Sequence, residues 1–151
     1  MSFLDSIKEG LGKAEQAEQA CKEVAGVFRQ INEDLNTYSK GLSFAKSVSA
    51  LVSATAAIQR LSNPHKENEF LDADKLILVL DDGQGNKTTC EVGGWRQSVK
   101  GYPCIIQYEG EEVFCFSAEE LSDAIKGLFS SASFGKKLKK LLSSPTQEDS
   151  P

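Results

Sequence analysis

The sequence predicts an α+β fold: an N-terminal long helical hairpin, then a small antiparallel β-meander of about four strands, packed by a C-terminal helix. Residues 1–62 repeat apolar positions at helical spacing. Residues 75–116 contain a short apolar run and alternating stretches between turn-forming clusters, and residues 117–142 return to helical spacing. The length of 151 residues fits one domain, or a small domain with an extended arm.

Apolar or small residues recur along the first 42 residues at alternating steps of three and four, a 3.5-residue repeat typical of a helix that faces another helix. The repeat predicts a strong helix from about Lys13 to Ser39. Its second half is the candidate partner seam: Cys21, Val24, Phe28, Ile31, Leu35 and Tyr38. We expect either burial of this seam inside the chain or its use as an interface with a partner or a second copy.

A second helix is predicted from Ser43 to about Leu61. Gly41 stands where a helix C-cap glycine belongs, and Ser43 is a suitable N-cap residue. A ridge of small residues follows at intervals of four: Ala45, Ser49, Ser53 and Ala57. Such a ridge lets two helices approach closely, so residues 1–62 are predicted to form a helical hairpin or a coiled-coil-like arm. A continuous helix, or a hairpin that dimerises into a four-helix bundle, is the alternative.

Residues 63–74 are mostly polar and are predicted to be a linker after Asn63-Pro64. The apolar run 76–80 is typical of a buried strand, and residues 81–86 consist of turn-forming Asp, Gly, Gln and Asn. Residues 87–92 alternate as a second strand, and Gly93-Gly94 predicts a bend or bulge after it.

A second hairpin is predicted with a defined register. Residues 104–108 and 111–116 flank the two-residue loop Glu109-Gly110. This loop places Cys104 opposite Cys115 and Ile106 opposite Val113, whereas a slip of one residue would set polar side chains against apolar ones.

The C-terminal region is predicted to be helical. Ser117 and Glu120 have the spacing of a capping box, and Leu121, Ile125, Leu128 and Phe129 then fall on one face. A last helical stretch ends at Leu142, so residues 75–142 form the meander with its helices. Residues 143–151 lack apolar side chains and are predicted to be a disordered tail.

Composition excludes several kinds of chemistry. The chain has one histidine, His65, in the predicted linker, so catalytic and metal sites that need several histidines are excluded. The acidic loop 81–86 lacks the ligand spacing of a calcium site. We therefore expect no catalytic residue, no cofactor and no metal ion. No apolar run is long enough to span a bilayer and no secretory signal is visible, which predicts a cytoplasmic protein.

The four cysteines are predicted to be structural thiols, because no Cys-x-x-Cys motif occurs. A visible secretory signal, which would indicate an oxidising compartment, is also lacking. The predicted register nevertheless makes Cys104 and Cys115 cross-strand neighbours. A redox-active disulfide or half of a metal site is therefore the alternative.

The net charge of −5 is unevenly distributed. Residues 134–142 carry a candidate basic patch on an amphipathic segment: Lys136, Lys137, Lys139 and Lys140. The other residues, with 13 basic and 22 acidic side chains, carry −9. This acidic balance argues against specific nucleic acid binding. The patch suits weak contact with an anionic membrane surface. Alternatively, it is a solvated helix end whose lysines are stabilised by the negative end of the helix dipole.

Trp95 beside Arg96 is a candidate interface aromatic, with a core position as the alternative.

These features favour a small acidic, non-catalytic protein–protein interaction module, such as an adaptor, inhibitor, immunity-type or chaperone-like binder. It would use the helical seam and the acidic surface to bind a protein partner, for which a basic protein is suited, or to self-associate. The alternative is a membrane-surface factor that uses the basic patch together with the N-terminal residues Phe3, Leu4, Ile7 and Leu11. A cysteine-based redox or metal protein is the third hypothesis.

Overall fold

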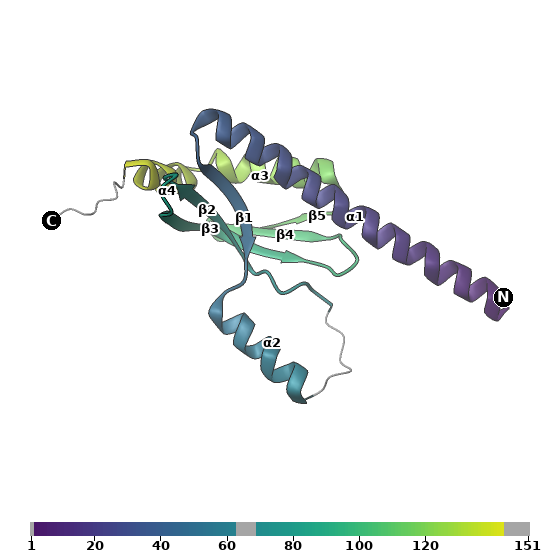
Figure 1. Cartoon of the computed structure of the whole chain (residues 1–151). Helices are drawn as coiled ribbons and strands as arrows, with labels where there is room; N and C mark the ends of the chain where they lie inside the picture. Colours follow the sequence, from purple (N-terminus) through teal and green to yellow (C-terminus); the bar gives the residue numbers. More distant parts are fainter. Residues whose placement is uncertain (1, 63–68, 144–151) are drawn as a thin grey trace.

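A computed structural model describes residues 2–62 and 69–143. Within them the chain forms four helices and five strands, shown in Figure 1. In chain order they are α1 (Phe3–Tyr38), β1 (Leu42–Ser47), α2 (Ala50–Ser62), β2 (Lys75–Asp81), β3 (Lys87–Gln97), β4 (Cys104–Tyr108), β5 (Glu111–Cys115), α3 (Ala118–Phe129) and α4 (Ala132–Ser143). The predicted disordered tail, residues 143–151, lies outside the described residues except for Ser143, and so does half of the predicted linker, residues 63–68.

The α+β class predicted from the sequence is confirmed. The strands form one antiparallel sheet in the order β1-β2-β3-β4-β5, which is a meander in which every strand pairs with its neighbour in the sequence. The sheet has five strands where about four were predicted. The additional strand is β1, and it comes from the region assigned to the helical hairpin.

The predicted helical hairpin is wrong, because residues 42–47 form an edge strand. Leu42 and Phe44 alternate with less buried neighbours and point into the core, opposite Leu80 and Leu78 of β2. The Asn32 side chain of α1 fixes this strand: its carbonyl oxygen accepts from the Phe44 N–H at 2.7 Å, and its amide donates to the Phe44 carbonyl at 3.1 Å. The second helix therefore begins at Ala50, and it does not pack back on α1.

Gly41 makes the turn between α1 and β1. The predicted helix end near Ser39 is confirmed, but the C-cap residue is Ser39 and not the glycine. Its φ of +87° lies in the left-handed region that favours glycine. A Cβ atom at this position would lie 2.2 Å from the Asp81 carbonyl oxygen, so the close approach of the two chains also requires a glycine. The Gly41 N–H donates to the Asn36 side chain at 3.1 Å.

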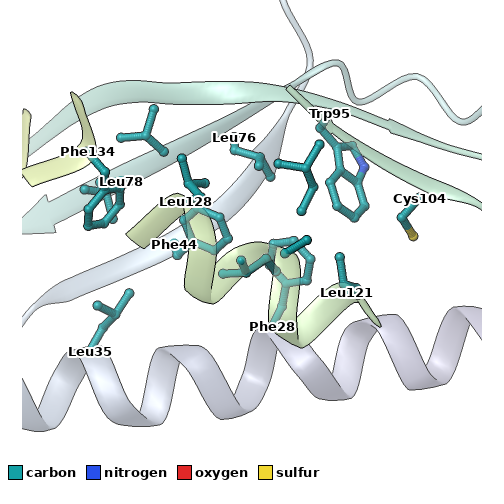
Figure 2. Packing of buried hydrophobic residues seen from close by; sticks show 14 of the residues in the cluster. Phe28, Leu35, Phe44, Leu76, Leu78, Trp95, Cys104, Leu121, Leu128 and Phe134 are labelled. Atoms are coloured by element: carbon teal, nitrogen blue, oxygen red, sulfur yellow. The ribbon is translucent and has the colours of Figure 1, made fainter. Parts of the chain in front are cut away.

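The core lies between one face of the sheet and the helices α1, α3 and α4 (Figure 1). Figure 2 shows side chains from the strands pointing towards α1 and α3. Phe28 of α1 stacks on Phe44 with ring centroids 5.3 Å apart, and it meets Trp95 edge to face at 5.4 Å. The remaining large buried side chains include Leu35, Leu76, Leu78, Val92, Ile106, Leu121, Ile125, Leu128 and Phe134. Half of α1 thus belongs to the main core.

The second hairpin has the predicted register, since Cys104 pairs with Cys115 and Ile106 with Val113. The bend predicted at Gly93-Gly94 is a shift of register between β2 and β3 at that point. The Ser117 hydroxyl accepts from the Glu120 N–H at 3.1 Å, as predicted. The Glu120 carboxylate accepts from Phe116, one residue before the N-cap, instead of from Ser117 itself.

Candidate functional site

The candidate partner seam lies mainly inside the protein. Val24, Phe28 and Leu35 are buried in the core, and Cys21 and Ile31 are half-buried. Tyr38 at the end of the helix is 70% exposed. The sheet and α3 cover this seam, whereas the sequence predicted a second helix or a partner there. Most of the seam is therefore not free to bind another molecule.

The other half of α1 projects beyond the sheet, as Figure 1 shows at the end marked N. We call residues 3–19 the arm, and at 1.5 Å per residue it is about 26 Å long. Its large apolar side chains are Phe3, Leu4, Ile7 and Leu11, which are 90%, 60%, 59% and 62% exposed. The arm thus presents an apolar stripe that nothing in the described chain covers.

A capping box begins the arm. The Ser2 hydroxyl accepts from the Asp5 N–H at 3.1 Å, and the Asp5 carboxylate accepts from the Ser2 N–H at 3.3 Å. Two backbone N–H groups at the helix start are thereby satisfied, and an acidic side chain opposes the positive end of the helix dipole. On the polar side of the arm Glu9 and Lys13 form an exposed ion pair at 3.6 Å. These local interactions favour helix in a segment that gains little from tertiary packing.

The arm ends where α1 meets the loop between β3 and β4. Ala20 is buried against Gly101, whose φ is +98°. A Cβ atom on Gly101 would come within 2.3 Å of the Ala20 side chain. Three residues further along α1, Glu23 accepts a hydrogen bond from the Tyr102 hydroxyl at 2.9 Å. These contacts separate the exposed arm from the buried half of α1.

The apolar stripe of the arm does not face the same way as the buried half. In a helix with 3.6 residues per turn, successive residues are about 100° apart around the axis. Counting along the sequence, the centre of the Leu4, Ile7 and Leu11 group lies about 100° around the axis from the centre of the Val24, Phe28 and Leu35 group. The stripe is therefore turned away from the face of α1 that packs on the sheet.

Helix α2 is a second uncovered element. Leu51, Ile58 and Leu61 recur at helical spacing and are strongly exposed. No helix or strand of the described chain packs extensively against α2 (Figure 1). Isolated helices of this length are marginal in water. An uncovered apolar face on α2 is therefore a second surface that a partner could stabilise.

An acidic hollow of about 470 Å³ lies between the β3 bulge and the tip of the β4–β5 hairpin. Its carboxylates come from Glu91, Glu109, Glu111 and Glu112, and Lys137 of α4 also lines it. Glu112 accepts from the Gln107 amide at 2.6 Å, and Glu109 accepts from the Ser133 N–H at 3.1 Å. Its charge suits a basic side chain. The hollow was not predicted from the sequence, although three of its glutamates, Glu109, Glu111 and Glu112, lie at the tip of the predicted second hairpin; Glu91 comes from the preceding strand.

The candidate basic patch lies on the exposed face of α4, with Lys136, Lys137, Lys139 and Lys140 all exposed. The apolar face of the same helix is occupied, since Phe134 and Leu141 are buried in the core. Insertion of this apolar face into a membrane would therefore require the helix to leave the body. The lysines remain available for electrostatic contacts only.

The interface role predicted for Trp95 is wrong, because its side chain is 1% exposed and lies in the core. Trp95 follows the β3 bulge, which turns it towards Phe28. Its indole N–H has no hydrogen-bond acceptor among the described residues. Lys46 of the edge strand β1 places its ammonium group 5.8 Å from the indole ring and 5.4 Å from the Phe28 ring.

Cys104 and Cys115 lie opposite one another in the core, and both are free thiols. Burial raises the pKa of the Cys104 thiol to about 12 and that of Cys115 to about 11. The neighbouring thiol contributes to the first shift, and the Glu120 carboxylate contributes to the second. A thiolate is the nucleophile and the metal ligand, so this environment disfavours both reactions at neutral pH.

In residues 2–62 and 69–143, no three His, Cys, Asp or Glu side chains are grouped so that they could hold a metal ion. No helix in these ranges is both long and apolar enough to cross a membrane. No family model, curated protein or solved structure matches the chain. The main candidate site is the exposed apolar stripe of the arm, and the acidic hollow is a second one.

Proposed function

We propose that this protein is a non-catalytic interaction module that docks a helical segment of another protein chain along its arm. The observation that carries the proposal is the exposure of Phe3, Leu4, Ile7 and Leu11 on one stripe of a helix whose other half is anchored in the core. Amphipathic helices dock partners through apolar positions at this spacing. Contiguous exposed apolar side chains of this size mark interaction surfaces.

The anchoring of α1 supports this function. The buried half is held by Val24, Phe28 and Leu35, so the arm is presented in a fixed direction from the body. A partner helix would meet a preformed helix and would bear little of the entropy of ordering it. The acidic hollow provides a second, charged contact for a basic partner.

The charge of the arm favours a protein partner over an anionic membrane. Residues 3–19 contain four acidic and two basic side chains. Peripheral helices that bind anionic lipid are instead rich in lysine and arginine on the polar face. The basic patch that would suit such a membrane lies on α4, and the apolar face of α4 is buried.

We propose a cytoplasmic location, where the four cysteines would stay reduced.

Photo-crosslinking in a lysate of the native host tests the proposal. The full chain is prepared with a benzoylphenylalanine in place of Phe3, on the stripe, and separately in place of Gln16, on the opposite side of the arm. We expect a discrete protein adduct, identified by mass spectrometry, from position 3 and not from position 16. Equal labelling from both positions, or no protein adduct from position 3, would contradict a docking role for the arm.

A further inference from the structure

We infer that the helix docked on the arm is the arm of a second copy of this chain, in antiparallel orientation. This inference rests on the proposed function and names its partner. The stripe is suited to such pairing because its large side chains, Leu4, Ile7 and Leu11, are followed by the small Ala14. In a two-fold contact the same surface meets itself reversed, so one end of the stripe lies against the other.

The spacing defines the register. Leu4, Ile7, Leu11 and Ala14 follow steps of three, four and three, which makes a short two-helix seam. With the two-fold axis near residue 9, Leu4 of one copy lies against Ala14 of the other. Ile7 lies against Leu11 in the same way, and each contact occurs twice. Every layer of the seam is then apolar.

The flanking residues fit the same register. Gly10 comes beside its own copy at the axis, where a small residue permits close approach of two helices. Phe3 comes beside the half-buried Ala17 of the second copy, so a large side chain again meets a small one. On the other edge Lys8 approaches Glu15 of the second copy, which is favourable.

The pairing stays clear of the folded body. The paired segment spans about residues 3 to 17, and α1 meets the body at Ala20. The stripe is also turned by about 100° from the face of α1 that packs on the sheet. Eight large apolar side chains, four from each copy, leave water. A contact of this length is smaller than a permanent dimer interface, and we expect a dissociation constant on the order of 10 µM.

Sedimentation equilibrium of the purified full chain tests the pairing. We expect a monomer–dimer equilibrium that Ile7→Glu weakens at least tenfold, because a charge would replace a central apolar layer. Gln16→Glu adds the same charge on the opposite side of the arm and should leave the equilibrium unchanged. Only monomer at several hundred micromolar, or a dimer insensitive to Ile7→Glu, would overturn the inference.

The register is tested by two glycines of the arm. A Cβ atom added at Gly10 or at Gly12 meets no other atom within 4 Å, so both positions accept a side chain. With diamide as the oxidant, Gly10→Cys should form a disulfide-linked dimer much faster than Gly12→Cys, which lies off the seam. The parent chain, with its half-buried Cys21 and Cys90, provides the background rate. Equal rates for both variants would contradict this register.

A charge exchange separates antiparallel from parallel pairing. Lys8→Glu should weaken the dimer several-fold by placing it near Glu15 of the second copy, and adding Glu15→Lys should restore the affinity. If Glu15→Lys does not restore the affinity, the antiparallel arrangement is overturned.

The lysate experiment distinguishes the two proposals. An adduct between position 3 and a different protein, with only monomer in the purified sample, would contradict pairing with a second copy and leave the docking function intact. The absence of any adduct removes both.

Discussion

The two halves of α1 follow one 3.5-residue repeat and meet opposite surroundings. In the half from Ala20 to Tyr38, the apolar positions Val24, Phe28 and Leu35 are buried by the sheet and α3. In the arm, Phe3 and Ile7 occupy equivalent positions of the repeat and are exposed. The period of a helix therefore predicts that it has an apolar stripe, whereas the extent of the neighbouring sheet determines what covers that stripe.

Length explains where the surroundings change. A helix of 36 residues is about 54 Å long, and the strands beneath α1 have between 5 and 11 residues. The sheet therefore ends before the helix does. The slow rotation of a 3.5-residue repeat around a straight helix also turns the arm stripe away from the body. Apart from the prediction on the buried thiols of β4 and β5, each prediction below concerns the buried half of α1, the arm or the junction between them.

The largest expected effect is on the buried half. Phe28→Ala should lower the free energy of unfolding by about 3–5 kcal/mol, because it removes a buried ring that contacts Phe44 and Trp95 and leaves a cavity. Phe3→Ala makes the same chemical change in the arm and should alter the stability of the dilute protein by less than about 0.5 kcal/mol. Urea unfolding followed by tryptophan fluorescence measures both. Similar losses for the two variants would remove the distinction between the halves.

The next effect concerns the junction. Gly101→Ala should destabilise the protein by about 2 kcal/mol or more, because the added Cβ would meet Ala20 and the backbone of α1, and because the φ of +98° is unfavourable for alanine. Gly110→Ala at the hairpin tip is the control, since its φ is also positive but no atom lies within 4 Å of the added Cβ. It should cost about 1 kcal/mol. Equal losses in urea unfolding would mean that the contact with Ala20 is unimportant.

The buried thiols predict a pH dependence of stability. The pKa values of Cys104 and Cys115 are raised to about 12 and 11 in the folded state, and an unfolded thiol ionises at about 9. The unfolded chain therefore loses these protons first, so stability should be constant below pH 8 and should fall as the pH rises from about 9 towards 11.

Unfolding measured between pH 7.5 and 10 checks this dependence. The Cys104→Ala/Cys115→Ala double variant should show a smaller decrease at alkaline pH than the parent. Cys90→Ala, at a half-buried position, should keep the slope of the parent. A parent chain whose stability does not change over this range would contradict the burial of the two thiols.

Much of this fold could be predicted from the sequence, and the part that could not depends on distant pairing. The β4–β5 register and the Ser117 cap were predicted, because the partners lie within a few residues of each other. The strand β1 was not predicted. Its residues 42–47 pair with β2 about 30 residues later, and Phe44 also fits a helical repeat with Val48. Residues 42–47 could form either a strand or a helix by their local pattern. The pairing with β2 selects the strand, and this distant partner cannot be read from residues 42–47 themselves.

The candidate site shows the same limit. Phe3, Leu4, Ile7 and Leu11 were recognised as apolar from the sequence, but they were assigned to the membrane alternative. The sequence cannot show that Phe28 is covered while Ile7 is exposed, because both lie on one unbroken repeat. For Trp95 the sequence left an interface and a core position open for a similar reason, since the direction of its side chain depends on the β3 bulge and on Phe28 across the core.

A smaller effect is expected from the hydrogen bond at the junction. Tyr102→Phe removes the hydroxyl that donates to Glu23 at 2.9 Å and should lower stability by about 1 kcal/mol, since the contact is partly open to water. Glu23→Gln keeps an acceptor oxygen and should have the smaller effect of the two. Chemical unfolding of both variants measures the difference. A larger loss for Glu23→Gln than for Tyr102→Phe would show that the carboxylate acts through another contact.

The smallest effect is expected in the arm, and it depends on concentration. Leu11→Ala should leave the free energy of unfolding unchanged at 1 µM protein, because Leu11 is 62% exposed and alanine is a better helix former than leucine. If the arm pairs with a second copy, the parent should gain thermal stability as its concentration rises from 1 to 200 µM, since association stabilises the folded state by mass action. Leu11→Ala should reduce this gain, which differential scanning calorimetry at the two concentrations measures. A loss of stability already at 1 µM would mean that the arm packs on its own body, and the contrast between the two halves of α1 would then be wrong.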